Sequence, residues 1–204
     1  MRKKSDNMEM SECRQNLKDN KKIQESIRTI LKEIGEDPDR EGLQRTPFRY
    51  AKACEEWFAG YHFSPKDVLN RQFTESCGIV IEGPISFFSH CEHHMAVFYG
   101  NAYIAYIPDK HVTGLDKLVK LVEIYARRLQ IQERLTQQIA DGLYGTLECE
   151  GVMVVITAKH LCVCSRETKN ATSNTVTSEV RGAFKENEKA RNEVLELIKL
   201  SKEI

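Results

Sequence analysis

Two short stretches of the chain combine thiols and imidazoles in a way that suits a metal ion. Residues 89–94 are Ser-His-Cys-Glu-His-His, and residues 160–164 are His-Leu-Cys-Val-Cys. Zinc prefers a tetrahedron of sulfur and nitrogen ligands, and three protein ligands with one open position are typical of a catalytic site. These residue types therefore indicate a zinc centre that the two stretches build together.

The spacing within each stretch allows its donors to reach one ion. Cys91 and His94 are separated by two residues, so a single turn can aim both side chains at the same point. If residues 152–164 form one strand, then His160, Cys162 and Cys164 lie on the same face of it, because side chains alternate along a strand. We therefore expect one face of this strand to offer a nitrogen and one or two sulfurs to the ion.

The same residues allow either a structural or a catalytic site. A structural site would close a shell of four ligands, namely Cys91, His94, Cys162 and Cys164. A catalytic site would use three ligands and a water, whose pKa an open zinc lowers from about 15.7 to about 7. Three titratable side chains without a task in a structural site favour the catalytic alternative: Glu92, His93 and His160. A neutral imidazole of His93 or His160 could then transfer protons.

Composition indicates an ordinary globular enzyme. Hydrophobic residues make up 41% of the 204 residues and charged residues 29%. Lysine plus arginine equals aspartate plus glutamate at 30 each, which gives no electrostatic argument for nucleic acid as a partner. The apolar runs are too short to span a membrane, and residues 1–20 lack the apolar region of a secretory signal. Seven cysteines, an odd number, without such a signal favour reduced thiols and a cytoplasmic protein.

The first 63 residues read as a tail followed by helices. Residues 1–20 are polar and nearly free of large apolar groups, which predicts a disordered tail. Apolar residues recur at helical spacing over residues 21–34, and Gly35 is placed to end that helix. Thr46 and Pro47 suit the start of a second helix, with a capping hydroxyl and a proline in the first turn. This helix is expected to end at Phe58, and residues 21–63 form an N-terminal helical segment.

Residues 64–204 are expected to form the catalytic domain. β-Branched and aromatic residues predict strands at 78–82, 85–89, 97–107, 152–164 and 175–180. Apolar stripes predict helices at 115–129, 133–147 and 186–200, with a break or kink at 130–133. This order favours an α+β fold with an antiparallel sheet and helices on one face. A sheet this small leaves open edges, which oligomerisation through the sheet would cover.

Several motifs between residues 42 and 200 resemble the GTP cyclohydrolase I family. The main ones are Cys-Glu-His-His at 91–94, Gly-Leu-Asp-Lys-Leu at 114–118, Gln-Glu-Arg-Leu-Thr at 132–136, His-Leu-Cys at 160–162 and Thr-Val-Thr-Ser at 175–178. Thr-Pro-Phe-Arg at 46–49 and Gly-Ala-Phe at 182–184 add to them. Each motif alone is weak, but all of them in this order and spacing are hard to obtain by chance.

The resemblance implies a fold, an assembly and a reaction. The fold is the tunnelling fold (T-fold), and copies of the chain join their sheets into a homodecamer with active sites between subunits. In the reaction, zinc-bound water adds to C8 of GTP, the imidazole ring opens and C8 leaves as formate. Rearrangement and ring closure then give 7,8-dihydroneopterin triphosphate, in the first step of tetrahydrofolate and pteridine biosynthesis.

The resemblance also assigns the metal ligands and the proton-transfer residues. It makes Cys91, His94 and Cys162 the zinc ligands. His93 and His160 become the histidines that transfer protons and contact the substrate. Cys164 lies on the expected metal face, where it could compete as a ligand or react with oxidants.

Five further residues are assigned to GTP by the resemblance. Gln132 and Glu133 would bind guanine, whose N1–H and 2-amino groups are adjacent donors that one carboxylate can accept together. Glu133 would also be favourable simply as an acid at the start of a helix. The triphosphate would be surrounded by Lys117, Arg166 and Arg49, since guanidinium groups make paired contacts to phosphate oxygens.

Three other positions depart from the family pattern. Asp116 stands where serine is usual before the lysine, which puts an acid close to the expected phosphates. Glu167 stands where glycine is common, and Lys120 stands where the family often has arginine. These changes bear on substrate affinity more than on the chemistry.

Two other functions fit parts of the sequence. The nitrile reductase of the queuosine pathway shares the fold, but it uses a cysteine nucleophile and needs no catalytic zinc, so the complete Cys/His/Cys set argues against it. A zinc-stabilised scaffold or regulatory subunit without catalysis is favoured only by Asp116 and Glu167. The intact residues weigh more heavily, and we expect an active enzyme; they are His93, Glu133, His160 and Arg166.

Overall fold

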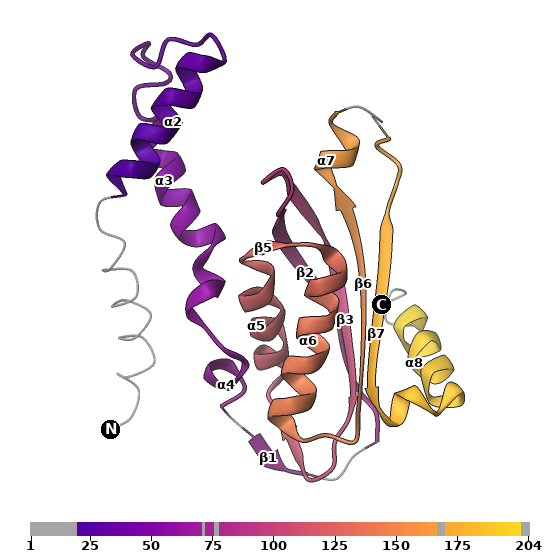
Figure 1. Ribbon diagram of the computed structural model, residues 1–204. Coiled ribbons are helices and arrows are strands. Elements are labelled where there is room, and N and C mark those ends of the chain that lie inside the picture. Colours follow the sequence, from indigo (N-terminus) through magenta and orange to yellow (C-terminus); the bar gives the residue numbers. More distant parts are fainter. Residues whose placement is uncertain (1–19, 71, 76–77, 167–169, 201–204) are drawn as a thin grey trace, which may run out of the picture. The chain divides into compact units, whose positions relative to one another are not determined.

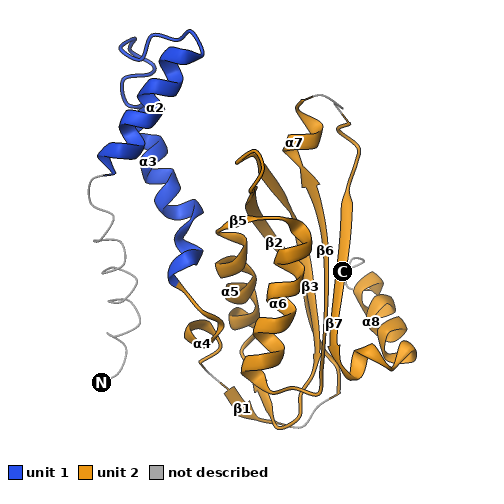
Figure 2. Ribbon diagram, in the orientation of Figure 1, with its two compact units in different colours: residues 1–62 blue, residues 63–204 orange. Residues whose placement is uncertain are grey.

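The computed structural model describes residues 20–70, 72–75, 78–166 and 170–200 (Figure 1). The tail expected at residues 1–20 lies outside this description, except for Asn20. The chain divides into two compact units, residues 1–62 and residues 63–204 (Figure 2). This division falls beside the boundary that we propose from the sequence, between residues 63 and 64.

The first unit is a pair of helices followed by a short 3-10 turn. Helix α2 covers Lys21–Glu33, helix α3 covers Thr46–Trp57 and the turn η1 covers Ala59–His62. Gly35 follows α2 with a φ of 88°, a left-handed conformation that suits glycine after a helix. Thr46 is the first helical residue of α3 rather than its cap, and no side chain caps this helix. The expected ends of both helices are correct to within one residue.

The second unit is built on a five-stranded sheet with the order β5-β2-β3-β6-β7. The strands are β2 (Val80–Cys91), β3 (Val97–Ile107), β5 (Leu129–Gln130), β6 (Gly151–His160) and β7 (Thr175–Gly182). Every neighbouring pair is antiparallel except β2 and β5, which run parallel. Strands β1 (Gln72–Thr74) and β4 (His111–Thr113) form a separate small antiparallel pair. The α+β fold with an antiparallel sheet is confirmed.

Two predictions that concern β2 and its neighbour β5 need correction. The segments expected at 78–82 and 85–89 form one strand, β2, whose pairing with β3 shifts register between Glu82 and Ile85. Proline lacks a backbone donor, and a bulge at this point lets the strand continue past Pro84. The expected break at 130–133 contains the end of β5, which pairs with His90 and Cys91 of β2. A strand of two residues is too short to produce a recognisable alternation of side chains.

Helices cover both faces of this sheet. Helices α5 (Leu115–Ala126) and α6 (Gln132–Leu147) pack side by side on one face (Figure 1). Their buried side chains meet those of the central strands in the main core, which includes Leu121, Leu135, Ile139, Ile104, Val154 and Ile156. Helix α8 (Glu188–Leu200) instead buries Val194 and Ile198 in a second cluster with Tyr103 and Met153. The expectation of helices on one face therefore holds for α5 and α6, whereas α8 packs on the other.

Three short elements complete the unit. Helix α4 (Pro65–Val68) begins with a capping box formed by Ser64 and Asp67, and the 3-10 turn η2 (Ala183–Lys185) connects β7 to α8. Helix α7 (Leu161–Cys164) follows β6. Within the described ranges, no helix is long and apolar enough to cross a membrane.

The strand expected at 152–164 ends early, at His160. His160 pairs with Phe98 of β3, which itself begins at Val97, and β7 reaches β6 only as far as Ala158. Beyond His160 the backbone has no neighbouring strand to bond with, so it coils into α7, where Ser165 N–H donates to the Leu161 carbonyl at 2.8 Å. The prediction that Cys162 and Cys164 share a strand face with His160 is therefore wrong.

Replacing Gly100 with alanine tests how closely β3 and β6 approach. A Cβ at this position would overlap the carbonyl oxygen of Thr157 and lie 2.6 Å from the Cα of Ala158, both in the backbone of β6. We expect Gly100→Ala to destabilise the fold by about 3 kcal/mol, which lowers Tm by roughly 6–12 °C in thermal unfolding. Gly145→Ala is the control, because a Cβ there meets nothing within 4 Å in helix α6. A Tm equal for both variants would contradict the close approach.

Candidate active site

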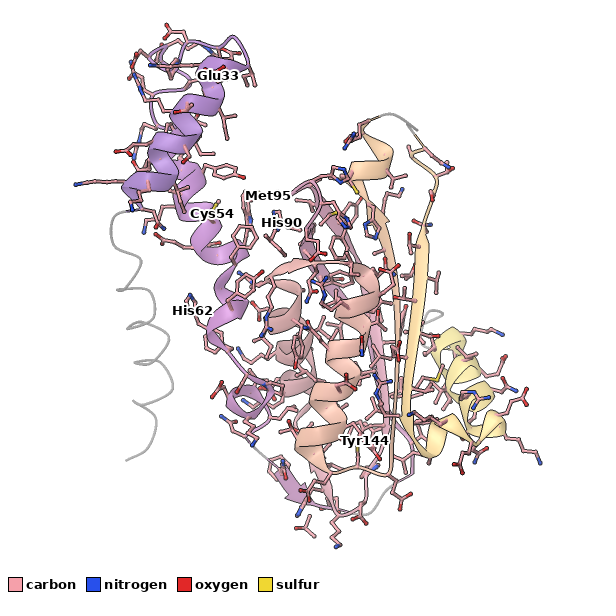
Figure 3. All side chains as sticks on the ribbon, in the orientation of Figure 1. Glu33, Cys54, His62, His90, Met95 and Tyr144 are labelled. Carbon is pink, nitrogen blue, oxygen red and sulfur yellow. The ribbon has the colours of Figure 1, made fainter. Side chains whose placement is uncertain are left out.

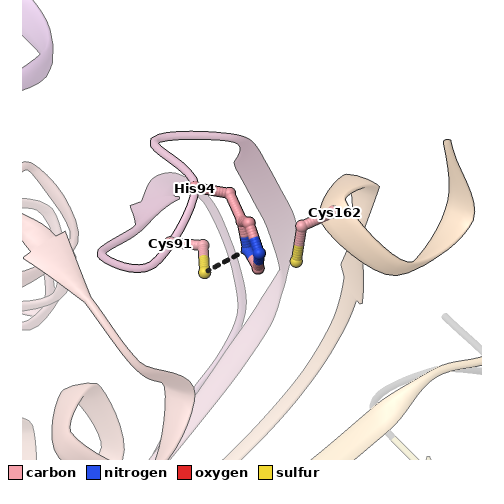
Figure 4. A group of neighbouring side chains, drawn as sticks. All are labelled: Cys91, His94 and Cys162. Carbon is pink, nitrogen blue, oxygen red and sulfur yellow. Dashed lines mark hydrogen bonds between the residues drawn. The ribbon is translucent and has the colours of Figure 1, made fainter. Parts of the chain in front are cut away.

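Three of the expected metal ligands lie together at one end of the sheet. The donor atoms of Cys91, His94 and Cys162 all lie within 4.8 Å of one another, with their side chains turned inward (Figure 4). Within the described part of the chain, this is the single group of three or more His, Cys, Asp or Glu side chains so arranged. Two sulfurs and one nitrogen therefore converge from two segments that are distant in sequence.

Cys91 and His94 are held by a backbone turn at the end of β2. Cys91 N–H donates to the Ala96 carbonyl and Met95 N–H donates to the Cys91 carbonyl, each at 2.8 Å. Met95, which Figure 3 labels, has a φ of 51°, a left-handed conformation that closes the turn. Sγ of Cys91 lies 3.8 Å from Nδ1 of His94 and 3.8 Å from Nδ1 of His93. Both imidazoles of the turn are thus next to the buried thiol.

Cys162 reaches the same place from helix α7. It is half-buried, and burial, followed by the neighbouring Cys91 thiol, raises the pKa of its own thiol. Metals bind the thiolate, so metal binding here must displace a proton. Cys164 is on the same helical turn but does not belong to the group of three, so the described residues favour three ligands over a closed shell of four.

His160 lies at the end of β6 with its ring fixed in place. The ring stacks on Phe98 with 4.6 Å between centroids and 4° between planes. Its Nε2 is 2.9 Å from Oε1 of Gln132. Burial lowers the pKa of His160, against a smaller opposing effect of the Glu133 charge, so the imidazole is neutral near pH 7. A neutral imidazole can accept a proton as well as pass one on.

Gln132 and Glu133 begin helix α6 and have opposite environments. Gln132 is 1% exposed, and its amide nitrogen lies 3.1–3.2 Å from three acceptors, the carbonyl oxygens of Ile156 and Thr175 and Oγ1 of Thr177, which share its two hydrogens. Glu133 is exposed. One turn of helix therefore supplies an inward amide that contacts His160 and an outward carboxylate that a ligand can reach.

An ion pair connects helix α6 to the turn at residues 91–96, which carries Cys91 and His94 and is called the metal-binding turn after its proposed role. Arg134 donates from both of its terminal nitrogens to the two carboxylate oxygens of Glu92, at 2.6 and 2.9 Å. This contact lowers the pKa of Glu92 and keeps it ionised. Backbone bonding adds to the connection, because Glu92 N–H donates to the Gln130 carbonyl at 3.0 Å. Glu92, with no assigned task in the sequence, thus helps to position the turn.

The basic residues expected around the triphosphate have different surroundings. Lys117 near the start of α5 is 16% exposed, and its Nζ lies 3.4 Å from the carboxylate of Asp116. Arg166 is exposed just beyond α7, and its charge makes a minor contribution that lowers the pKa of Cys162. Arg49 is exposed on α3 and belongs to the other unit. Glu167 lies outside the described residues.

Phe98 and Arg134 are the two contact residues that sequence patterns did not single out. Phe98 reads as an ordinary strand aromatic, and only the pairing of Phe98 with His160 reveals the stack. Arg134 stands inside the motif at 132–136, where the neighbouring Glu133 drew the assignment to substrate. Its Glu92 partner is 42 residues away, which is beyond any local pattern.

Comparison with known proteins identifies the family of the chain. Residues 23–199 match the family model of GTP cyclohydrolase I. The GTP cyclohydrolase 1 of Campylobacter jejuni is 48% identical over 90% of this chain and 98% of its own length. The enzyme of the same name from Thermobifida fusca is 50% identical over 88% of both chains.

A solved structure, the archaeosine synthase QueF-Like in the apo form, is much less similar. It is 16% identical, with a TM-score of 0.45, over 53% of this chain and 98% of its own. This likeness is too weak to bear on the function.

The match to the family model covers most of the chain, and the two relatives agree with it. The chain belongs to the GTP cyclohydrolase I family.

Proposed function

We propose that the chain catalyses the reaction of its family, in which GTP and water give 7,8-dihydroneopterin triphosphate and formate. One observation supports this beyond family membership: Cys91, His94 and Cys162 converge at the end of the sheet from which His160 projects. The reaction needs a nucleophilic water and a group that exchanges protons with the purine ring. Both requirements are met by residue types found here.

The donor set fits zinc. Two cysteine sulfurs and one imidazole nitrogen are ligands that zinc prefers, and a set of three corresponds to catalytic rather than structural sites. We assign Cys91, His94 and Cys162 to hold it. When bound there, zinc would act as a Lewis acid that makes water nucleophilic near neutral pH.

Two histidines are proposed to handle protons and contact the substrate. His160 is neutral and held by stacking and by a hydrogen bond, so its ring is already oriented before a proton moves. His93 is exposed in the metal-binding turn, beside Cys91. We assign both His160 and His93 to proton transfer while the imidazole ring of GTP opens. His160 is the more rigid of the two.

Guanine is proposed to bind at the start of helix α6. The exposed carboxylate of Glu133 can accept hydrogen bonds from N1–H and the 2-amino group of guanine together. The amide side chain of Gln132 is occupied by protein partners, so Gln132 would contribute through its backbone N–H. Backbone N–H groups in the first turn of a helix lack acceptors within the helix and suit a guanine carbonyl.

The triphosphate is proposed to contact Lys117, Arg166 and Arg49. Asp116 would weaken the attraction of Lys117 for phosphate, because its carboxylate lies 3.4 Å from the ammonium of Lys117 and offsets part of that positive charge. Lys120, one helical turn beyond Asp116 on α5, adds a further cation. The Asp116–Lys117 pair is also the observation that favours a second possibility, a family member that binds metal without turning over GTP.

We also propose a cytoplasmic homodecamer with active sites between subunits. Strands β5 and β7 are the outer strands of the five-stranded sheet, and edges of this kind are covered when copies pair with one another. The cysteines of the described residues, Cys54, Cys91, Cys149, Cys162 and Cys164, are all free thiols, in keeping with a reducing compartment. Neither nucleic acid nor a membrane is proposed as a partner.

Replacing Cys162 with serine is expected to remove bound zinc and turnover together, because a hydroxyl is a poor substitute for a thiolate ligand. Purified protein would be incubated with GTP, and formate release and the fluorescence of oxidised neopterin would be followed, with metal content measured in parallel. Cys164→Ser is the matched control, since it lies on the same turn outside the group of three. A chelator should abolish product in the parent protein, and added zinc should restore it. Full turnover without metal would refute the assignment.

Replacing Glu133 with alanine is expected to raise KM for GTP by on the order of a hundredfold or more. The reason is the loss of two hydrogen bonds to a charged acceptor, each worth roughly 1.5–3 kcal/mol. The KM of Glu133→Gln should lie between those of the parent protein and Glu133→Ala, since glutamine keeps one acceptor oxygen. Steady-state kinetics at several GTP concentrations gives the measurement. An unchanged KM in Glu133→Ala would exclude the contact with guanine.

Replacing Glu92 with glutamine is expected to weaken zinc binding by about tenfold to a hundredfold, the usual effect of disturbing groups that orient metal ligands. The variant loses the paired contact to Arg134 while its size is retained. Competition with a zinc-binding dye would measure affinity. Asp141→Asn is the control, because it breaks a comparable ion pair between α6 and Arg181 of β7. Equal zinc affinity in both variants would show that the Glu92–Arg134 pair does not hold the turn.

A further inference from the structure

The side chain of Gln132 is hydrogen-bonded at both ends of its amide. Its nitrogen contacts the carbonyl oxygens of Ile156 and Thr175 and the hydroxyl of Thr177, at 3.1–3.2 Å. Its oxygen contacts Nε2 of His160 at 2.9 Å. The residue is 1% exposed, so these protein groups rather than solvent satisfy it. An amide with two carbonyl acceptors on one side can present only its NH2 group there.

Two threonine hydroxyls fix the direction of the bonds in the same way. Thr136 Oγ1 donates its one hydrogen to the backbone carbonyl of Gln132 at 2.7 Å. Thr136 Oγ1 must therefore accept in its 2.7 Å contact with Oγ1 of Thr177. The hydroxyl of Thr177 donates its one hydrogen in this contact. Thr177 is left as an acceptor for the Gln132 amide nitrogen. The bonds thus close a ring from Gln132 through Thr177 and Thr136 back to Gln132.

This ring determines which nitrogen of His160 carries hydrogen. Since the amide nitrogen of Gln132 faces its acceptors, the amide oxygen faces His160 and can only accept. Nε2 of His160 must then be the N–H donor, and a neutral ring has its lone pair on Nδ1. The stack on Phe98 holds the plane of the His160 ring in the orientation in which Nε2 meets the amide oxygen of Gln132.

We propose that Gln132 is a positioning residue that holds His160 as its Nε2–H tautomer and leaves Nδ1 as the ring atom that exchanges protons with the substrate. Thr136 and Thr177 serve this role by orienting the amide. The consequence for turnover rests on the proposed function, whereas the tautomer itself does not. Any proton that the ring takes up or returns while the purine imidazole opens passes through Nδ1, and the Nε2–H bond to Gln132 stays in place.

The tautomer can be measured directly in the zinc-loaded protein. Histidine labelled with ¹⁵N and ¹³C, studied by magic-angle-spinning NMR at a pH where the ring is neutral, distinguishes the two tautomers by their nitrogen shifts. His160→Gln identifies the signal by its loss. We expect the Nε2–H form in the parent protein. An Nδ1–H form, or an even mixture, would overturn the proposal, whether or not the protein converts GTP.

Gln132→Met tests the role in turnover, because methionine fills a similar space without either polar group. We expect kcat to fall by about tenfold to a hundredfold, with KM for GTP and zinc content near those of the parent and with a mixed His160 tautomer. Thr177→Val, a smaller change that keeps the carbonyl acceptors of the amide, should shift both readouts in the same direction by less. Gln137→Met is the matched control, since Gln137 is exposed on the same helix.

The outcomes separate the two proposals. Normal kcat in a folded Gln132→Met protein, or a tautomer unchanged in that variant, would refute the positioning role. A uniform loss of zinc and Tm in Gln132→Met, together with parental kcat and tautomer in Thr177→Val, would reduce Gln132 to a structural residue. A parent protein that makes no product from GTP would instead refute the proposed function, and the tautomer measurement would stand.

Discussion

The point at which the ladder between β3 and β6 ends determines the rest of the site. Because Phe98 pairs with His160 near the start of β3, the histidine meets an aromatic face instead of solvent. Beyond this pair β6 has no neighbouring strand, so the chain turns into α7 and brings Cys162 to the turn that carries Cys91 and His94. The histidine proposed for proton transfer and the cysteine proposed as a metal ligand are thus positioned by the same register, and a slip of one residue would move both.

Much of this arrangement could be predicted from residue types and periodicity. The helices at 115–147 and the strands of the sheet follow from apolar stripes and β-branched runs, because burial of one face imposes those periods on the sequence. Thiols and imidazoles at short spacing predict a metal site, and the resemblance to the family selects Cys91, His94 and Cys162 as its donors. What failed was the face argument for Cys162 and Cys164, since it assumed a strand whose partners end at His160. Strand ends depend on neighbours far along the chain, which no local window contains.

The same limit explains why Phe98, Arg134 and the buried role of Gln132 were not predicted. Each acts through a contact between distant segments: a stack across β3 and β6, an ion pair from α6 to the metal-binding turn, and an amide that joins α6 to β6 and β7. The motif at 132–136 shows that these positions matter but not which direction each side chain takes. Helix geometry separates them, with Gln132 inward and Glu133 outward.

The proposed metal donors lie on either side of helices α5 and α6 in the sequence, since Cys91 precedes both helices and Cys162 follows them. An ion bound to both segments would close a loop of chain that contains α5 and α6, the two helices on one face of the sheet. Ligands that bind only the folded state stabilise it in proportion to the logarithm of their concentration. An ion bound to both segments would therefore raise the free energy of unfolding of this chain. If that ion is the zinc proposed above, scarcity of zinc would lower the stability of the fold as well as the activity.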